Sequence, residues 1–494
     1  MEVPKIKLPN TKLFINNEWV DPVVPKTFKA ISPITEQVIC EISEGDAADV
    51  DKAVKVARDC FDNVWTNYTG EERGRLLYKL ADLIDEEKEY IAQLESLDNG
   101  KPIKDSFGYD VFSSSQTLRY YAGWADKVQG KQIPLGEGFT SYTRHEPIGV
   151  VGFITPWNFP LMILAWKFGP AIAAGCTIVA KPSEETSLTA LYFAELVKKA
   201  GFPPGVFNLI CGYGVTVGNA ISGHMGIDKV SFTGSTRTGK TIMASAAQSN
   251  LKKVTLELGG KSPNIIFEDA DLEFAAIGAK AAMYFNMGQS CIAGSRLFVQ
   301  ESIYDKFLEI FTAKVKELKL GNPYDKSTEQ GSLASKIHFD RVMSYINKGK
   351  EEGATIHLGG GRYGDKGYFV EPTIFTNVKD SMTICKEEIF GPVICILPFK
   401  NVDEVLKRAN DTEYGLAAGV FTKDINLALQ VGNKLKAGSV WINQYNMVNI
   451  QAPFGGYKQS GIGKDLGEYA IIDYCAIKTV AVSHRTFQAH THPK

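Results

Sequence analysis

Strand-like and helix-like segments alternate through residues 148–258, and this rhythm constrains the fold more than any other feature of the chain. The segments fall, in order, at residues 149–155, 161–174, 177–181, 188–200, 206–210, 229–232, 238–247 and 254–258. Alternation of this kind predicts βαβ units and therefore a parallel, doubly wound sheet. Because ligands bind such sheets at the carboxyl ends of the strands, the residues that follow each strand are the first candidates for a site.

A second α/β block is expected after residue 264. Helix-like segments at residues 272–284, 303–318 and 339–352 alternate there with strand-like segments at 297–299 and 393–397. Three helices, near residues 46–61, 71–96 and 109–127, precede the first block, and Asp46 is placed to cap the first of them. The 494 residues exceed the roughly 250–300 at which a single core stops growing. We therefore expect an α/β fold with at least two domains.

Charge, cysteine usage and the chain start narrow the classes of function. The net charge of -2 gives no electrostatic basis for binding nucleic acid or an acidic membrane. The eight cysteines are scattered, without a CxxC pair or a zinc-type His spacing, and His490 and His492 are too few for a metal site. We expect no metal and a reducing compartment. The first residues resemble neither a signal peptide nor a transit peptide, and the apolar runs fall short of the ~18 residues of a membrane span, so a cytoplasmic location is expected.

Residues 285–296 (FNMGQSCIAGSR) set one thiol, Cys291, among small residues. Most cysteines in soluble chains are small buried hydrophobes. A reactive one needs backbone donors or a nearby base, since a free thiol has a pKa near ~8.5. The small neighbours of Cys291 leave room for both.

A lone carboxylate, Glu257, lies in the apolar run 254–258, which ends at Gly259 and Gly260. A buried carboxylate is costly unless it is paired or functional, and burial raises its pKa toward the range of a general base. A thiol together with such a carboxylate suits acyl chemistry.

Residues 234–241 (GSTRTGKT) form a literal G-x-x-x-x-G-K-T sequence, which predicts a P-loop between a strand and a helix. The acidic end of residues 265–269 could then hold magnesium. A nucleoside triphosphatase is therefore an open alternative. The G-x-G-x-x-G match at residues 359–364 is followed by no helical pattern, and we interpret it as a turn.

The stretches around Glu257 (LELGGK) and Cys291 (GQSCIAGSR) closely resemble the signature motifs of the NAD(P)-dependent aldehyde dehydrogenase superfamily. The similarity runs from about Leu13 to about Val482, and residues 141–147 resemble the class 1/2 branch. The resemblance implies a Rossmann-like cofactor domain, a second α/β catalytic domain and a small β oligomerisation flap. It places the NAD-binding domain at residues 1–128 and 148–259, the catalytic domain at 260–459, and the flap with the C-terminal tail at 129–147 and 460–494.

The resemblance also assigns catalytic roles. Cys291 would be the nucleophile and Glu257 the base that activates the hydrolytic water. Asn158, in the sequence TPWNFP after the first strand, would form the oxyanion hole together with the Cys291 amide. An amide is a neutral donor that suits a transient oxyanion. The alternative is that Asn158 only holds the turn before Pro160. Lys167 and Asp465 match a proton relay in which relatives often carry a glutamate in place of Asp465.

Residues that match the cofactor site imply NAD. A Lys181 and Glu184 pair can clamp ribose hydroxyls, and a carboxylate there repels a 2'-phosphate, whereas the alternative is a solvated charge pair. Glu388 and Phe390 would contact the nicotinamide ribose and ring, and His338 stands where most relatives have Gln. The full set implied is Thr155, Trp157, Lys181, Ser183, Glu184, Gly214, Gly234, Ser235, Gly239, Leu258, His338, Glu388 and Phe390.

The implied function is the NAD-dependent oxidation of an aldehyde to a carboxylic acid by a homotetramer, with a homodimer as the alternative. The positions matching the substrate tunnel are Ser113, Phe159, Trp166, Ile292, Met447, Val448 and Phe454. Ser113 and Val448 are small, which predicts tolerance of longer aliphatic, aromatic or retinal-like aldehydes. Because His338 and Asp465 depart from the pattern, a structural, crystallin-like protein with little turnover is a further alternative.

Overall fold

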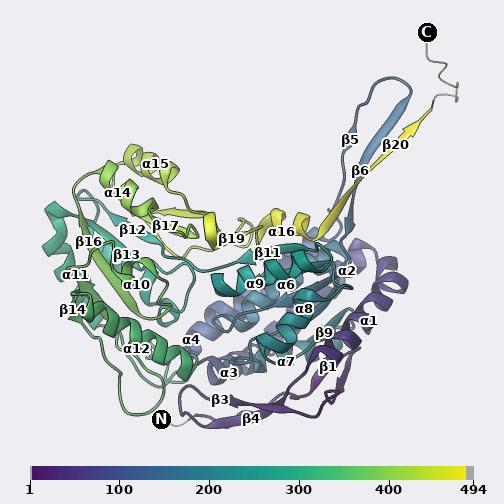
Figure 1. Cartoon of the computed structure of the whole chain (residues 1–494), viewed down its shortest axis with the longest axis horizontal. Helices are drawn as coiled ribbons and strands as arrows, with labels where there is room; N and C mark the ends of the chain where they lie inside the picture. The colour runs from purple at the N-terminus through teal and green to yellow at the C-terminus, as the bar shows by residue number, and fades with distance from the viewer. Residues whose placement is uncertain (1–2, 485–494) are drawn as a thin grey trace.

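The computed structural model describes residues 3–484 and divides them between two large sheets, from which a narrow flap projects (Figure 1). The tail with His490 and His492 lies outside the described residues. No helix within residues 3–484 is long and apolar enough to cross a membrane, and over the same range no three His, Cys, Asp or Glu side chains gather as a metal site would require.

The first sheet has eight strands in the order β19-β11-β10-β7-β8-β9-β1-β2. These are β1 (Leu13–Ile15), β2 (Glu18–Val20), β7 (Val150–Ile154), β8 (Thr177–Lys181), β9 (Phe207–Leu209), β10 (Lys229–Thr233), β11 (Lys253–Glu257) and β19 (Gly461–Ile462). The five strands from β11 to β9 are parallel, and their order reverses between β7 and β10. The predicted parallel, doubly wound sheet is confirmed, and the reversal marks the crevice where such sheets bind ligands.

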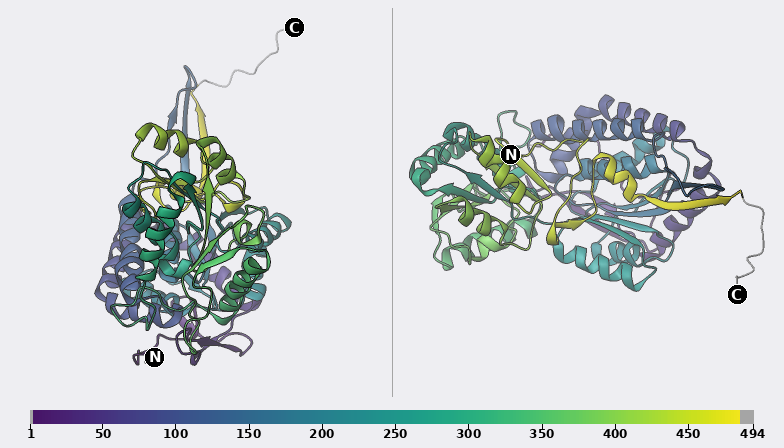
Figure 2. Two further views of the ribbon diagram at one scale, coloured as in Figure 1. Left: turned by 90° about the vertical axis from the view of Figure 1, so that its left-hand side faces the viewer. Right: turned by 90° about the horizontal axis from the view of Figure 1, so that it is seen from above.

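Helices cover both faces of this sheet (Figure 2). On one face lie α1 (Ala47–Asn63), α8 (Asn219–Gly223) and α9 (Thr236–Gln248); on the other lie α6 (Pro160–Ala174) and α7 (Leu188–Ala200), with α2 (Gly70–Glu86), α3 (Lys88–Asn99) and α5 (Phe112–Trp124) packed outside them. Every residue of α6 is buried, because this helix is enclosed between the sheet and the outer helices. Its sequence, PLMILAWKFGPAIAA, is accordingly apolar almost all round.

The first three expected helices are present with changed bounds. Asp46 caps α1 as predicted, and its side chain accepts a hydrogen bond from the amide of Ala48. The helix expected over residues 71–96 is broken at Glu87 into α2 and α3, although the apolar stripe continues because both helices face the same core. The third begins at Phe112 rather than near residue 109, after the short α4 (Ile103–Asp105) and a π-helical turn at Ser106–Val111.

The second sheet has seven strands in the order β14-β15-β16-β13-β12-β17-β18, and all but β14 are parallel. The strands are β12 (Pro263–Ile266), β13 (Arg296–Gln300), β14 (Thr355–Leu358), β15 (Thr373–Thr376), β16 (Val393–Phe399), β17 (Ala417–Phe421) and β18 (Ser439–Ile442). Its helices are α10 (Leu272–Tyr284), α11 (Tyr304–Lys316), α12 (Lys336–Glu351), α13 (Thr383–Lys386), α14 (Val402–Asn410) and α15 (Ile425–Lys434). The expected second α/β block is confirmed.

The flap consists of β5 (Gln132–Ile133), β6 (Phe139–Pro147) and β20 (Cys475–Ser483), paired antiparallel in the order β20-β6-β5. A boundary at residue 460 is too early, because β19 pairs with β11 of the first sheet and α16 (Gly467–Asp473) packs against α6. A hairpin of β3 (Thr27–Ile31) and β4 (Val38–Ser43) forms a separate two-stranded sheet.

The chain passes from the first sheet to the second through residues 258–262, between β11 and β12, and returns through residues 443–460, between β18 and β19. Cys291 precedes β13, and Glu388 and Phe390 precede β16. The carboxyl edge of the first sheet therefore meets loops at the amino edge of the second sheet. This edge-to-edge arrangement determines where a site can form.

Candidate active site

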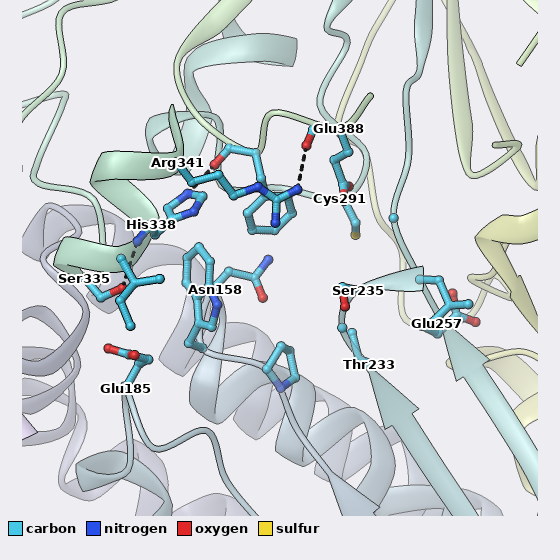
Figure 3. A pocket seen from close by; sticks show the side chains of 17 residues that line it. Asn158, Glu185, Thr233, Ser235, Glu257, Cys291, Ser335, His338, Arg341 and Glu388 are labelled. Carbon is cyan, nitrogen blue, oxygen red and sulfur yellow. Dashed lines mark hydrogen bonds between the residues drawn. The ribbon is translucent and has the colours of Figure 1, made fainter. Parts of the chain in front are cut away.

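Two loops of the first sheet open the site at the point where the strand order reverses. The loop after β7 carries Trp157 and Asn158; Thr233 ends β10, and the loop after it carries Gly234 and Ser235. All five residues line one cavity, together with residues from the second sheet (Figure 3). The crevice predicted from the strand alternation therefore corresponds to this cavity of the structure.

Cys291 is held between the two sheets by a strained loop. Asn286 and Met287 have φ angles of 50° and 56°, in the left-handed region that non-glycine residues rarely adopt. On the other side of the thiol, the hydroxyl of Tyr445 donates to the carbonyl of Ile292 at 2.8 Å. The loop conformation is thus enforced by tertiary contacts and not by local preference.

The two glycines after β11 are required by close packing. A Cβ at Gly260 would lie 2.2 Å from the carbonyl oxygen of Cys291, and a Cβ at Gly259 would lie 2.5 Å from the Glu388 carboxylate. The amide of Gly260 donates to the same carboxylate at 2.8 Å. The glycine pair therefore brings the carboxylate motif, the thiol loop and Glu388 into contact.

Glu257 ends β11 in a buried position, and neither carboxylate oxygen has a hydrogen-bond partner among the described residues. Burial, and next the negative charge of Asp465, hold its pKa well above the ordinary range of a carboxyl. Uncompensated buried carboxylates are rare in folded proteins, and they mark candidates for acid–base chemistry. The expected burial of Glu257 is confirmed.

The side chain of Asn158 is held at the thiol loop. Its Nδ2 donates to the carbonyl of Gln289 at 3.0 Å, and the same carbonyl accepts from Asn286. An amide nitrogen carries two hydrogens, so the second remains free for a ligand. In Figure 3 the Cys291 side chain is drawn between Asn158 and Glu257 at the edge of the cavity.

The thiol of Cys291 is a protonated resting group in this arrangement. Burial raises its pKa, and the carboxylates of Glu388 and Glu257 raise it further, while backbone amides of Cys291 and Ile292 act in the opposite direction. A thiolate therefore has to be formed when a ligand arrives, and Glu257 lies on the same two cavities as the thiol.

A second, apolar cavity meets the first at Thr233, Glu257 and Cys291. Five of the expected tunnel residues line it, namely Phe159, Trp166, Ile292, Val448 and Phe454. Ser113 instead lies on α5 with its carbonyl bonded to Thr117, and Met447 is 59% exposed. Tyr109 lines the cavity, and its ring packs edge-on against Phe285 at a centroid distance of 5.1 Å. Tyr109 and Phe285, and Met162 and Ile163 on α6, were not expected as lining residues.

Lys167 and Asp465 form a buried ion pair behind Glu257, with Nζ and Oδ2 2.9 Å apart. The shorter Asp side chain therefore reaches the lysine. Its backbone also pairs with Phe454 through two hydrogen bonds of 2.7 and 2.8 Å. The pair links the apolar cavity to the α6 helix.

The first cavity extends away from Cys291 past Leu258, Glu388, Phe390 and His338. Burial lowers the pKa of His338 to about 4, and its Nε2 donates to the carbonyl of Phe390 at 2.6 Å. The neutral ring lies beside the ring of Trp157, at a centroid distance of 4.7 Å and an interplanar angle of 52°. Burial raises the pKa of Glu388 to about 7, and Arg341 donates to its backbone carbonyl at 3.1 Å.

At the far end a shallower cavity continues the first through shared residues, Glu185, Ser335 and Ile337. Glu184 lines this continuation, and its Oε2 accepts from the buried Lys181 Nζ at 2.9 Å. The solvated charge pair considered as an alternative is therefore excluded, because Lys181 is 2% exposed. Glu185 and Arg341 were not predicted from the sequence as lining residues. The only sequence signals for them were that Glu185 follows the expected Glu184 and that Arg341 lies one helical turn after the expected His338.

Four expected cofactor residues do not line these cavities: Thr155, Ser183 and Gly239 are buried behind the walls, and Gly214 is exposed. Thr155 and Ser183 are buried, and the Thr155 amide donates to the carbonyl of Lys181 at 3.0 Å. Gly239 packs under Leu258, since a Cβ there would lie 2.6 Å from Leu258 Cδ2. Gly214 begins a π-helical turn, Gly214–Gly218, beside Tyr213 of the continuation.

Comparison with known proteins decides the family. The model of the "Aldehyde dehydrogenase family" matches residues 19–480. The chain is 55% identical to human mitochondrial aldehyde dehydrogenase over 473 residues, which is 95% of this chain and 92% of that protein. It belongs to the aldehyde dehydrogenase family.

Other members of the aldehyde dehydrogenase family agree with this assignment. Human aldehyde dehydrogenase 1A1 is 54% identical, with 97% of this chain and 96% of that protein covered. A solved NAD+ complex of aldehyde dehydrogenase from Bacillus cereus has a TM-score of 0.94 at 53% identity, covering 96% of each chain. NAD-dependent aldehyde oxidation is the activity that these relatives support, and they give no support to a crystallin-like or nucleoside triphosphatase function.

The residues of the first cavity fit NAD as the family implies. The N-terminus of the 13-residue helix α9, capped by Ser235, opens on the cavity beside Gly234 and suits a pyrophosphate. Thr233 Oγ1 is buried without a partner among the described residues. Aromatic walls and two carboxylates, Glu388 and Glu184, supply contacts for rings and ribose hydroxyls.

The literal P-loop sequence has a different structure. Helix α9 begins at Thr236, inside the motif, so Gly239 and Lys240 lie within the helix, and Lys240 is exposed. The acidic residues proposed for magnesium end a strand of the second sheet, where Asp269 accepts from the hydroxyl of Thr422 and the amides of Lys423 and Asp424. Neither half of the nucleoside triphosphatase interpretation is present.

Proposed function

We propose that the chain oxidises aldehydes to carboxylic acids through a covalent intermediate on Cys291. The observation that carries the proposal is that an apolar cavity and a cavity suited to NAD meet at Cys291 and Glu257. An aldehyde in the one and a cofactor in the other would reach the thiol from opposite sides. Holding the reactants in this way converts a bimolecular encounter into an oriented reaction.

In the first step the Cys291 thiolate adds to the aldehyde carbonyl and forms a thiohemiacetal. The proton of the thiol passes to Glu257, directly or through water, because this carboxylate opens on the same cavities. The oxyanion is stabilised by the free hydrogen of the Asn158 amide and by the Cys291 backbone amide. Neutral donors suit a charge that forms and then collapses.

Bound NAD would accept the hydride that leaves the thiohemiacetal carbon. The chain holds it by Lys181 and Glu184 at the adenine-side ribose, by Glu388 at the other ribose, and by Phe390, Trp157 and His338 along the ring. Gly234, Ser235, Gly239 and Leu258 shape the pyrophosphate region, and Thr155, Ser183 and Gly214 support the walls. A carboxylate at Glu184 disfavours a 2'-phosphate, so NAD is favoured over NADP.

In the last step water attacks the thioester, and the acid and free thiol are released. Glu257 is the base that takes the water proton. The Lys167–Asp465 pair beside it would carry that proton away from the site, with Asp465 reaching Lys167 in spite of its shorter side chain.

We propose an apolar aldehyde as the substrate. The apolar cavity is lined by the rings of Phe159, Trp166, Phe285 and Phe454, which favour aromatic or longer aliphatic groups over hydrated ones. Val448 lines this cavity with a small side chain, whereas the expected contribution of Ser113 is absent and the larger Tyr109 lines the cavity.

We also propose that the first sheet with its helices is the NAD-binding domain, the second sheet the catalytic domain, and the flap a homotetramer contact, with a homodimer as the alternative. Exposed apolar side chains on the flap, such as Leu135 and Ile477, support assembly. The eight free cysteines support a reducing compartment, and we propose the cytoplasm.

The test is NADH formation with NAD and a panel of apolar aldehydes. The wild-type protein is expected to turn over, Cys291→Ala to form no NADH, and Glu257→Gln to give one burst of NADH per site followed by a steady rate about 10²–10⁴-fold lower. A burst shows that the thiol is still acylated; a slower burst reports the loss of Glu257 as acceptor of the thiol proton, and the lower steady rate reports the loss of hydrolysis. Turnover by Cys291→Ala would refute the covalent mechanism.

A further inference from the structure

Three consecutive residues after β7 face three different parts of the site. Trp157 lines the NAD cavity, Phe159 lines the apolar cavity, and Asn158 lies between them at the thiol. A small rotation of the backbone at Asn158 would redirect its side-chain amide. What holds its backbone therefore determines where the Asn158 amide points.

The backbone of this segment is held by the end of α3. Asn99 Nδ2 donates to the carbonyl of Trp157 at 2.7 Å, and Lys101 Nζ donates to the carbonyl of Asn158 at 2.8 Å. The two donors flank Gly100, which has a φ of 86° and whose Cβ would lie 2.2 Å from Ser332 Oγ. A left-handed glycine thus aims both side chains at consecutive carbonyls.

Lys101 is an unusual anchor, because its side chain is 1% exposed. Its Nζ pairs with the buried Asp110, lies 3.8 Å from Glu95 Oε1, and sits 4.4 Å from the centre of the Phe159 ring. Burial and the charge of Asp110 raise the pKa of Glu95, whereas Asp110 pairs directly with the Lys101 side chain. Charges buried in this way add little stability compared with apolar residues of similar size.

We propose that Lys101 is a positioning residue, which fixes the Asn158 amide against the substrate oxyanion by holding the Asn158 carbonyl from behind, with Asp110 and Glu95 orienting its ammonium. This inference rests on the proposed oxyanion role of Asn158. The carbonyl also accepts from Asn286 Nδ2 at 3.1 Å, so the lysine links the segment to the loop that carries Cys291. An ammonium supplies three donors, enough for Asp110 and the carbonyl together.

Loss of this anchor should affect the transition state and spare substrate binding. A displacement of about 1 Å at a catalytic donor costs on the order of 10²-fold in rate. The donor acts only when the oxyanion forms, so kcat falls while the KM for the aldehyde and the affinity for NAD change little.

The experiment compares Lys101→Met with Asn158→Ala and with both together, in the full chain with NAD and one aldehyde. Because Lys101→Met leaves Asp110 unpaired, the same comparison is repeated with Lys101→Met/Asp110→Asn, which removes both charges. Lys104→Met, an exposed lysine one turn away, is the control.

The expected result is a roughly 10²-fold loss of kcat for either single change, no further loss when they are combined, and a wild-type rate for Lys104→Met. Losses that multiply, or a Lys101→Met/Asp110→Asn protein with wild-type kcat, would overturn the positioning role. If Asn158→Ala itself keeps the wild-type kcat, the proposed role of Asn158 fails, which is a separate outcome.

Discussion

The proposed chemistry of this chain depends on carboxyl groups that are kept from water. Glu257 and Glu388 both have a raised pKa because of burial, yet their surroundings differ: Glu257 lacks partners among the described residues, whereas Glu388 accepts from the Gly260 amide. The first suits a proton acceptor and the second a hydrogen-bond acceptor for ribose. Sequence motifs identified both residues, but only the tertiary structure shows that their hydrogen-bond partners differ.

Binding of NAD is expected to tighten as the pH rises through about 7. Below that value Glu388 is protonated, and above it the carboxylate can accept from two hydroxyls, so its affinity for a ribose increases. If the ionised form alone binds, the Kd should be about tenfold higher at pH 6 than at pH 8. Titration of tryptophan fluorescence with NAD measures this.

Glu388→Gln provides the control for that titration, since its side chain does not ionise. Its Kd should be flat between pH 6 and pH 8. A slope that persists in Glu388→Gln would assign the pH dependence to another group.

The loops between strands carry the site, and their shape is decided by contacts with other loops. The turn at Gly259 and Gly260 lies against Cys291 and Glu388, which come from segments far along the chain. Sequence periodicity identified β11 and α10 correctly but carried no information on this contact. The same limit explains why Tyr109 on a π-helical turn was missed and Ser113, on the regular helix that follows it, was chosen.

Gly260→Ala is expected to abolish most activity. The Cβ of the alanine would lie 2.2 Å from the backbone carbonyl oxygen of Cys291, and a backbone atom cannot move aside as the end of a flexible side chain can. A shift of the thiol by about 1 Å costs on the order of 10²-fold in kcat/KM. Steady-state kinetics with circular dichroism and a measured Tm test this. Gly108→Ala is the matched control, since its Cβ meets nothing within 4 Å; an unchanged rate for both variants would contradict the packing argument.

The flap gives the molecule an element that cannot bury its own apolar side chains. It has three strands and projects away from both large sheets, and Leu135 and Ile477 are 53% and 60% exposed (Figures 1 and 2). Small sheets without a packed layer are marginal in water, which is the basis of the proposed contact between copies of the chain at the flap.

Ile477→Asp is expected to lower the mass of the assembly measured by light scattering after gel filtration, because a buried carboxylate would be unpaired in the interface. Leu429→Asp, on α15 at the far side of the molecule from the flap, is the control and should leave the mass unchanged. Equal masses for wild type and Ile477→Asp would remove the flap from the interface.

The order of strands and helices, the parallel sheets and the identity of the thiol and carboxylate motifs were determined by the sequence itself. Hydrophobic periodicity and short motifs are properties of neighbouring residues, so they can be recognised without knowledge of tertiary contacts. Only the tertiary structure decided that the carboxyl edge of one sheet meets the amino edge of the other, that Tyr109 and Glu185 face cavities, and that Lys101 reaches Asn158. Each depends on segments distant in sequence, whose contacts arise from packing of the whole chain.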